Sequence, residues 1–209
     1  MTNAFGSEFR RVESREHLGQ PALAAILIRS YDTTVEDLWE ALTTPARLAR
    51  WFLPVEGELK LGGRYQLKGN AGGTITRCER PEALDLTWEI MGGTSWLNLR
   101  LARDGKKARL TLEHIAPKGG IGEEHMKKFG PGAVGIGWDL GLLGLERHLA
   151  APDTSLDHAA MEAWPLSAEG KAFVRASGEA WGAAEAASGE DPKEARARAE
   201  RTIAFYTGS

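Results

Sequence analysis

The chain has 209 residues, of which 42% are hydrophobic and 26% charged, a composition that fits one globular core with an appendage. Its net charge of −3 and its single cysteine, Cys78, argue against nucleic acid as a partner and exclude an intramolecular disulfide. No apolar run approaches the ~20 residues of a membrane span, and the polar start resembles no secretory signal. We therefore expect a cytoplasmic protein that binds neither nucleic acid nor membrane.

The first part of the chain predicts a strand followed by two short helices. Residues 1–21 are polar, and we expect an irregular lead-in there. The apolar run over residues 22–31 predicts a strand. Thr34 can cap a helix that carries an apolar stripe, and Thr44–Pro45 repeats the start signal for a second helix ending near Trp51.

From residue 56 onward the hydrophobic period changes to two, which is typical of half-buried strands. Leu59 and Leu61 alternate with polar residues, and a double glycine at residues 62–63 indicates a turn or bend. Alternation resumes through residues 65–67, 84–90 and 97–101. Asp104–Gly105 predicts a tight hairpin into a last strand that ends near His114. The pattern predicts a sheet with one dry and one wet face.

Residues 117–132 are polar and rich in glycine, which predicts a loop. The helix expected after it carries an apolar stripe formed by Trp138, Leu142, Leu145 and Leu149. Four glycines in or just before this helix each cost about 1 kcal/mol relative to alanine. This cost implies a compensating reason, such as the close approach of a strand or room left for a ligand.

Beyond residue 151 the composition shifts to alanine and charge. Ser167 can cap a helix to about residue 187, and Asp191–Pro192 starts another that ends near residue 206. We expect three parts: a lead-in over 1–21, a ligand-binding domain over 22–151 and a helical extension over 152–209. The extension, with Trp164 and Trp181, packs on the main domain in the simpler interpretation and supports a homodimer in the alternative.

Four segments carry a resemblance to a known family: VEDLWEALTTPARLARWF, RCERPEALDLTWE, LTLEH and GWDLGLLGLERHL. Together they resemble the activator-of-Hsp90-ATPase-like family of the START/polyketide cyclase/Bet v 1-like superfamily, over about residues 22–150. The resemblance implies an α+β helix-grip fold, in which a curved antiparallel sheet of six or seven strands holds a long C-terminal helix around an apolar cavity. The tail is similar to extensions in some bacterial members.

The residues expected to line this cavity share an inward position on a strand, or a place on the helices that face the sheet. They are Trp51, Phe52, Leu59, Tyr65, Leu67, Ile75, Leu86, Trp88, Leu97, Leu99, Leu112, His114, Trp138, Leu142 and Leu145. The alternative is that they merely fill a core. His114 either contacts a ligand or acts as an acid/base near neutral pH, or it is a core histidine satisfied by a backbone carbonyl, which we favour.

No cofactor, metal or catalytic residue is predicted. Glu123, Glu124 and His125, with His114 and His148, match no recognised metal-ligand spacing. The glycine motif at residues 130–135 lacks the preceding strand of a dinucleotide site.

Three hypotheses follow for the function. The first is non-enzymatic binding of a small apolar or amphipathic molecule in the cavity. The second is a cyclase- or aromatase-like enzyme that uses His114 as acid/base and Tyr65 as proton donor. The third is a co-chaperone-like contact with an Hsp90-type ATPase, which rests on the family resemblance.

Overall fold

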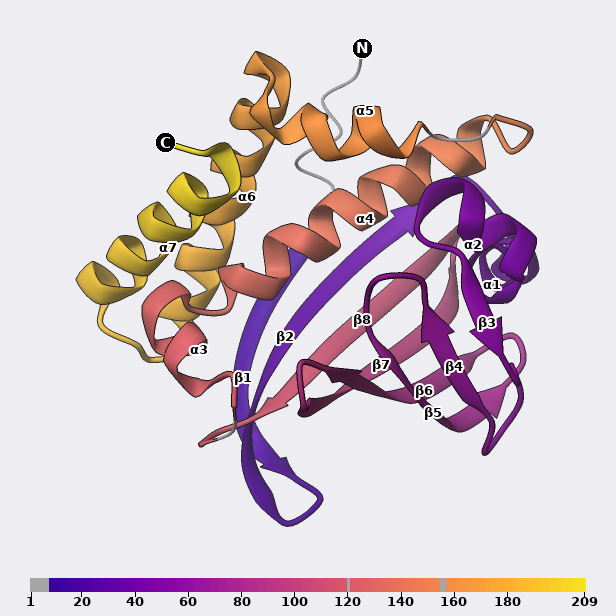
Figure 1. Cartoon of the computed structure of the whole chain (residues 1–209), viewed down its shortest axis with the longest axis horizontal. Helices are drawn as coiled ribbons and strands as arrows, with labels where there is room; N and C mark the ends of the chain where they lie inside the picture. Colours follow the sequence, from indigo (N-terminus) through magenta and orange to yellow (C-terminus); the bar gives the residue numbers. More distant parts are fainter. Residues whose placement is uncertain (1–7, 120, 155–156) are drawn as a thin grey trace.

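The structure, a computed structural model, describes residues 8–119, 121–154 and 157–209. An antiparallel sheet curves around one long helix, and further helices cover that helix on its outer side (Figure 1). The strands are β1 (Phe9–His17), β2 (Gln20–Tyr31), β3 (Val55–Gly57), β4 (Arg64–Leu67), β5 (Gly72–Glu79), β6 (Ala83–Ile90), β7 (Gly93–Asp104) and β8 (Lys107–Pro117). The helices are α1 (Val35–Thr43), α2 (Pro45–Trp51), α3 (Glu123–Phe129), α4 (Gly132–Ala150), α5 (His158–Ala163), α6 (Ala168–Ala187) and α7 (Pro192–Thr207), with a 3₁₀ turn at Trp164–Leu166.

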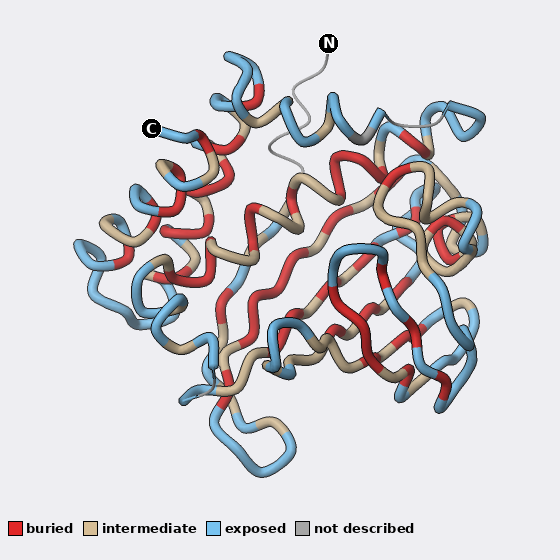
Figure 2. The backbone as a smooth tube through the Cα atoms, viewed as in Figure 1, coloured by how far each residue is buried: buried red, intermediate tan, exposed pale blue. Residues whose placement is uncertain are grey.

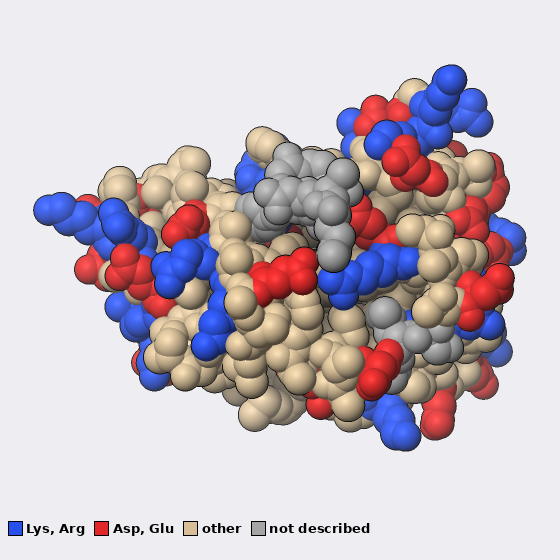
Figure 3. All heavy atoms as spheres, turned by 90° about the horizontal axis from the view of Figure 1, so that it is seen from above, with Lys and Arg blue, Asp and Glu red and all other residues tan. Residues whose placement is uncertain are grey.

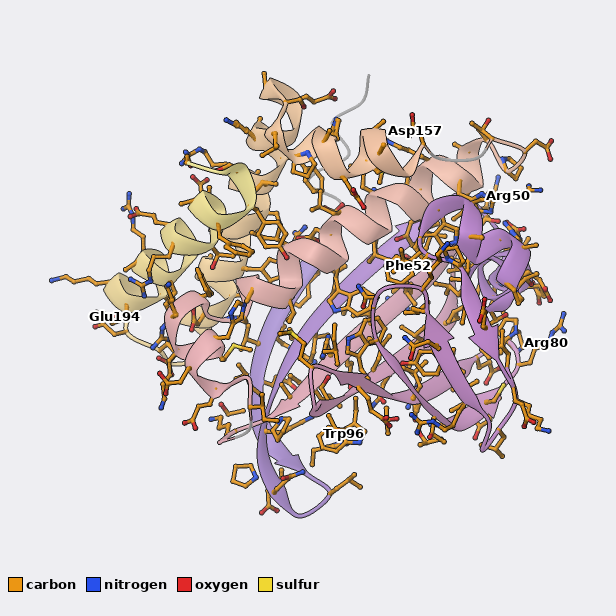
Figure 4. All side chains as sticks on the ribbon, in the orientation of Figure 1. Arg50, Phe52, Arg80, Trp96, Asp157 and Glu194 are labelled. Carbon is orange, nitrogen blue, oxygen red and sulfur yellow. The ribbon has the colours of Figure 1, made fainter. Side chains whose placement is uncertain are left out.

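The sheet has the strand order β1-β2-β8-β7-β6-β5-β4-β3, and each neighbouring pair is antiparallel. The α+β helix-grip prediction is therefore confirmed. The described sheet has eight strands rather than the six or seven expected. Alternate residues of β2 serve both faces: Leu27 belongs to the large core under α4, whereas Ile26 packs with Ile115 in a small apolar cluster on the other face. Trp96 covers that second cluster, on the side of the sheet away from α4 (Figure 4).

The additional strand comes from the segment expected to be an irregular lead-in. That expectation is wrong for residues 9–17, which form β1. Residues 1–7 lie outside the described residues. β1 pairs with β2 along its whole length, and only Val12 is a buried hydrophobic residue on it. The inward position two residues before Val12 is Arg10, whose guanidinium pairs with Asp139 of α4 at 2.8 Å. A charged residue at an inward position conceals the alternation by which a strand is recognised.

The helical opening follows the sequence signals closely. The hydroxyl of Thr34 accepts a hydrogen bond from the backbone N–H of Asp37 at 3.1 Å and so caps α1 as expected. Pro45 begins α2, but the expected hydroxyl cap is wrong: Thr44 donates to the carboxylate of Glu40 at 2.7 Å instead. The short connection places α1 and α2 across one end of the curved sheet (Figure 1).

Two other local expectations are wrong. Leu59 and Leu61, expected on a strand, lie in the loop between β3 and β4, where their side chains are 37% and 63% exposed. The turn predicted at the double glycine is present, with a positive φ of 78° at Gly62. The loop expected over residues 117–132 contains α3, which begins after Gly122 without a side-chain cap. With no cap and no buried residue, α3 gives little signal in the sequence.

The tail packs against the outer side of α4, as Figure 2 shows by the buried residues on the facing sides of α4, α6 and α7. Trp181 of α6 is 1% exposed, and a Cβ atom at Gly135 of α4 would overlap its indole ring. The cost of a glycine at position 135 is thus explained by the close approach of α6 and not of a strand. Because Trp181 is buried within its own chain, it is not available for self-association.

Charge is distributed evenly on the helical side of the molecule. On the face seen from above, Lys and Arg side chains are interspersed with Asp and Glu side chains (Figure 3). Among the described residues, no helix is long and apolar enough to cross a membrane.

Candidate ligand-binding site

A cavity of about 340 Å³ lies between the inner face of the sheet and helices α1, α2 and α4. This volume lies at the lower end of the range usual for small-molecule sites. Most of its wall is aliphatic or aromatic. The lining residues are Trp39, Leu42, Thr43, Leu48, Trp51, Phe52, Val55, Leu59, Tyr65, Leu67, Ile75, Cys78, Arg80, Leu84, Leu86, Trp88, Leu97, Leu99, Leu112, Trp138, Gly141 and Leu142.

The structure places all the residues predicted to point inward around this cavity except His114 and Leu145. Leu145 is fully buried among the core side chains, further along α4 than the cavity extends. His114 lies behind the wall and contacts Trp138 rather than the empty volume. That the lining residues bind a ligand stays a prediction.

An aromatic cluster forms the side of the cavity below α4. Phe52, just after α2, stacks between Trp51 and Trp138, with ring centroids 5.4 and 6.1 Å away. Trp138 in turn meets the ring of Trp88 edge-on at 5.1 Å. Figure 4 shows Phe52 beneath α4. These rings give the cavity an aromatic wall with a large apolar contact area.

His114 is held by hydrogen bonds to side chains. The indole N–H of Trp138 donates to its Nδ1 at 2.9 Å. Nδ1 therefore carries no proton, and Nε2 carries one and donates to the hydroxyl of Ser95 at 2.8 Å. Ser95 donates onward to the backbone carbonyl of Trp88 at 3.2 Å. The imidazole is consequently a buried, neutral group, and burial lowers its pKa to about 4.

This arrangement decides between the alternatives for His114. It is a satisfied core histidine, but its partners are Trp138 and Ser95, not the backbone carbonyl that we favoured. Both ring nitrogens are engaged, and the pKa is far below neutrality. An acid/base needs a free nitrogen facing the substrate and a pKa near the working pH. His114 therefore has a structural role at the back of the cavity wall.

Two other polar groups of the wall are also engaged with the protein. The indole N–H of Trp51 donates to the backbone carbonyl of Ala41 at 2.9 Å, and the hydroxyl of Tyr65 donates to the backbone carbonyl of Thr87 at 2.8 Å. Burial raises the pKa of Tyr65 far above its usual value, so the phenol is not a proton donor poised for catalysis near neutral pH. Within the described part of the chain, the indole N–H of Trp88 makes no hydrogen bond.

The mouth of the cavity is marked by its exposed lining residues, Leu59, Cys78 and Arg80. Arg80 lies in the turn between β5 and β6, at the right-hand side of the molecule in Figure 4, where its guanidinium forms an ion pair with Glu40 of α1. This pair connects the turn between β5 and β6 with α1 across the mouth.

Several lining residues were missed in the sequence. Leu84 continues the alternation of Leu86 and Trp88 and was identifiable from it. Trp39 and Leu42 occupy the buried stripe of α1, but no pattern shows which of the stripe residues meets an empty volume. Gly141 lies on α4 opposite Phe52, so the suggestion that a glycine leaves room at a cavity applies to this position. The complete set missed is Trp39, Leu42, Thr43, Leu48, Val55, Cys78, Arg80, Leu84 and Gly141.

The residues considered as a metal site are not brought together. Glu123 and Glu124 lie on α3, whereas Nε2 of His148 accepts a hydrogen bond from Arg47 at 3.1 Å near the other end of α4. In residues 8–119, 121–154 and 157–209, no three His, Cys, Asp or Glu side chains form a group that could hold a metal ion.

The sheet that curves around α4 and the cavity between them define the helix-grip, Bet v 1-like class of protein. The family model described as "Activator of Hsp90 ATPase homolog 1-like protein" matches residues 32–150. The chain therefore belongs to this family. A search of proteins with curated descriptions found no match.

Among solved structures, the crystal structure of CalU16 from Micromonospora echinospora is 32% identical with a TM-score of 0.68, over 86% of this chain and 98% of that one. Its solution NMR structure is 30% identical with a TM-score of 0.70, over 90% and 100%. Both matches cover a larger share of the chain than residues 1–150 represent, so the structural similarity extends into the helical tail. Protein MLL2253 from Mesorhizobium loti, 19% identical with a TM-score of 0.54 over 62% and 98%, shares the fold.

Proposed function

We propose that this protein binds a small apolar or amphipathic molecule in the cavity and does not transform it. The observation that carries the proposal is the cavity of about 340 Å³, walled by aromatic and aliphatic side chains and open at one end. Burying a ligand there removes apolar surface from water on both partners, at about 25 cal/mol per Å². Membership in the family supports a ligand-binding or cyclase-like role at this coarser level.

The state of the polar groups favours binding over catalysis. A cyclase-like reaction needs an acid and a base that converge on one point of the pocket. The two candidates, His114 and Tyr65, are engaged with protein partners, and burial shifts the pKa of each away from neutrality. The cavity thus offers shape and apolar area, and His114 and Tyr65 do not form a proton-transfer pair in it.

The test uses 1-aminoanthracene, a neutral apolar fluorophore, titrated into the purified protein. Gly141→Leu adds a side chain at a position where a Cβ atom makes only ordinary contact with Phe52, at 3.7 Å. We expect this variant to bind at least tenfold more weakly than the parent protein. Ala150→Leu, at the exposed end of the same helix, is the matched control and leaves the affinity within twofold.

A second measurement locates the bound fluorophore. Cys78 is the only cysteine, it is exposed and it lines the cavity. Its alkylation by iodoacetamide therefore slows when the cavity is occupied. The proposal fails if the fluorophore does not bind, or if Gly141→Leu and Ala150→Leu bind it equally well.

The predicted contact with an Hsp90-type ATPase stays a separate prediction. Its test is a pull-down with the purified chaperone, with and without a saturating concentration of the fluorophore.

A further inference from the structure

Charge is distributed unevenly around the cavity. Among the described residues that line it, Arg80 is the only one with a charged side chain. It stands at the mouth, with 68% of its side chain exposed, while the inner wall is apolar. A ligand that fills the cavity would therefore have its apolar body inside and meet a cation where it emerges.

Apart from the indole N–H of Trp88, the inner wall offers little to a polar ligand group. The polar hydrogens of Trp51, Tyr65 and Trp138 are donated to protein acceptors, and the hydroxyl of Thr43 donates to the backbone of Trp39 at 2.8 Å. A polar group placed deep in the cavity would lose its hydrogen bonds to water with few replacements, which is costly. Polar atoms of the ligand therefore belong at the mouth.

The partner that Arg80 has in the structure is exchangeable. Its ion pair with Glu40 lies at the surface, with side-chain exposures of 68% and 38%, and such pairs contribute little to stability. Glu40 also keeps a hydrogen bond from the hydroxyl of Thr44 at 2.7 Å, so it retains a partner when Arg80 turns away. The guanidinium fork matches a carboxylate with two parallel hydrogen bonds.

We infer that the ligand is an amphipathic anion: an apolar chain or ring system inside the cavity, with a carboxylate bound by Arg80 at the mouth. The inference rests on the proposed function, because it assigns the ligand class of the same cavity. The inference assigns Arg80 a selective effect on ligand binding. Arg80 recognises the charged group and contributes nothing to the binding of the apolar body.

The experiment compares dodecanoate with dodecanol, which share a twelve-carbon chain, by displacement of 1-aminoanthracene at pH 7. In Arg80→Gln we expect at least a fivefold weaker affinity for dodecanoate, with the affinity for dodecanol within twofold of the parent protein. Arg77→Gln is the matched control. Arg77 lies three residues earlier, has a side chain that is 42% exposed, pairs with Glu79 at 2.6 Å and does not line the cavity, so both affinities stay within twofold.

Glu40→Gln provides an independent arm that keeps Arg80 in place. Removing the competing carboxylate frees the guanidinium, so dodecanoate binds more tightly and dodecanol binds as before. If Arg80→Gln affects both ligands alike or neither, or if the parent protein binds only dodecanol, the inference is overturned while the proposed function stands. If the parent protein binds none of the three compounds, the proposed function itself is wrong.

Discussion

The two sides of α4 differ in how closely they are packed. One side carries Trp138, Gly141 and Leu142 and faces an empty volume. The other side carries Gly135 and Asp139 and is closely packed by Trp181 of the tail. Asp139 alone accepts hydrogen bonds from Arg10 of β1 and from Ser177 and Trp181 of α6. A single helix is thus anchored on one side and leaves a hollow on the other.

The difference shows where the stability of this fold comes from. Cavities made by truncating core side chains cost about 24 cal/mol per Å³. At that rate a dry void of about 340 Å³ would cost roughly 8 kcal/mol, comparable with the whole stability of a domain. The mouth admits water, which lowers this cost, but the hollow side still lacks dispersion contacts. The packed side with its buried ion pair therefore has to hold α4 in place.

The largest effect is expected at Asp139, whose side chain is 1% exposed. Asp139→Ala removes the carboxylate of α4 with which the guanidinium of Arg10, 5% exposed, forms an ion pair at 2.8 Å. Breaking one partner of a buried ion pair costs about 3–5 kcal/mol. Urea denaturation measures this loss, and Asp153→Ala in an exposed turn is the control. Equal stability of the two variants would mean that the packed side does not anchor α4.

The next effect is a pH dependence centred on His114. Burial lowers its pKa from 6.5 to about 4, so the unfolded chain binds a proton at a higher pH than the folded protein does. The stabilisation by the neutral imidazole is complete above pH 6.5 and is lost as pH falls toward 4, by about 3 kcal/mol. The difference in unfolding free energy between pH 7 and pH 4 should be smaller by this amount in His114→Gln. If the unfolding free energy of the variant depended on pH in the same way as that of the parent protein, this would contradict a neutral His114 that is hydrogen-bonded at both ring nitrogens.

Replacing single glycines by alanine tests the two sides of α4 directly. A Cβ atom at Gly135 overlaps the ring of Trp181, and such overpacking costs about 1–3 kcal/mol. At Gly141 the nearest atom is 3.7 Å away in Phe52, so alanine adds helix propensity and stabilises the protein by up to about 1 kcal/mol. Thermal unfolding of both variants should therefore shift in opposite directions. A shift of the same sign would show that the two sides are equally packed.

The smallest effect is expected at the mouth. Glu40→Gln removes an ion pair in which Arg80 is 68% exposed, and the free energy of unfolding should change by no more than about 1 kcal/mol. Calorimetry in low and in high salt provides the measurement. A larger loss would mean that the pair closes the mouth as a structural contact instead of an exchangeable one.

The fold could be predicted from the sequence to a considerable extent because most of its elements follow local rules. Thr34, Pro45 and Asp191 start helices where they were expected, and the hairpin after Asp104 joins β7 to β8. β1 was missed because Arg10 occupies an inward position. Its partner, Asp139, is 129 residues away in the sequence, and no local pattern contains that pairing.

The candidate site shows the same division. Alternation along β6, β7 and β8 identifies the face of the sheet that is turned toward α4, and Leu86, Leu99 and Leu112 of that face line the cavity. The alternation of residues along the strands cannot identify Arg80 as a residue at the mouth. The position of Arg80 depends on where the turn after β5 lies relative to α1. The engagement of His114 by Trp138 and Ser95 joins three elements and likewise escapes a local pattern.

The sequence by itself determined most of the elements and the faces they bury, because hydrophobic period, capping and turn chemistry act over a few neighbouring residues, and its motifs indicated the family. Only the tertiary structure decided which buried faces meet each other and which leave a hollow. An empty volume depends on how far apart two surfaces are held. In this protein that distance follows from contacts on the opposite side of α4, between residues far apart along the chain.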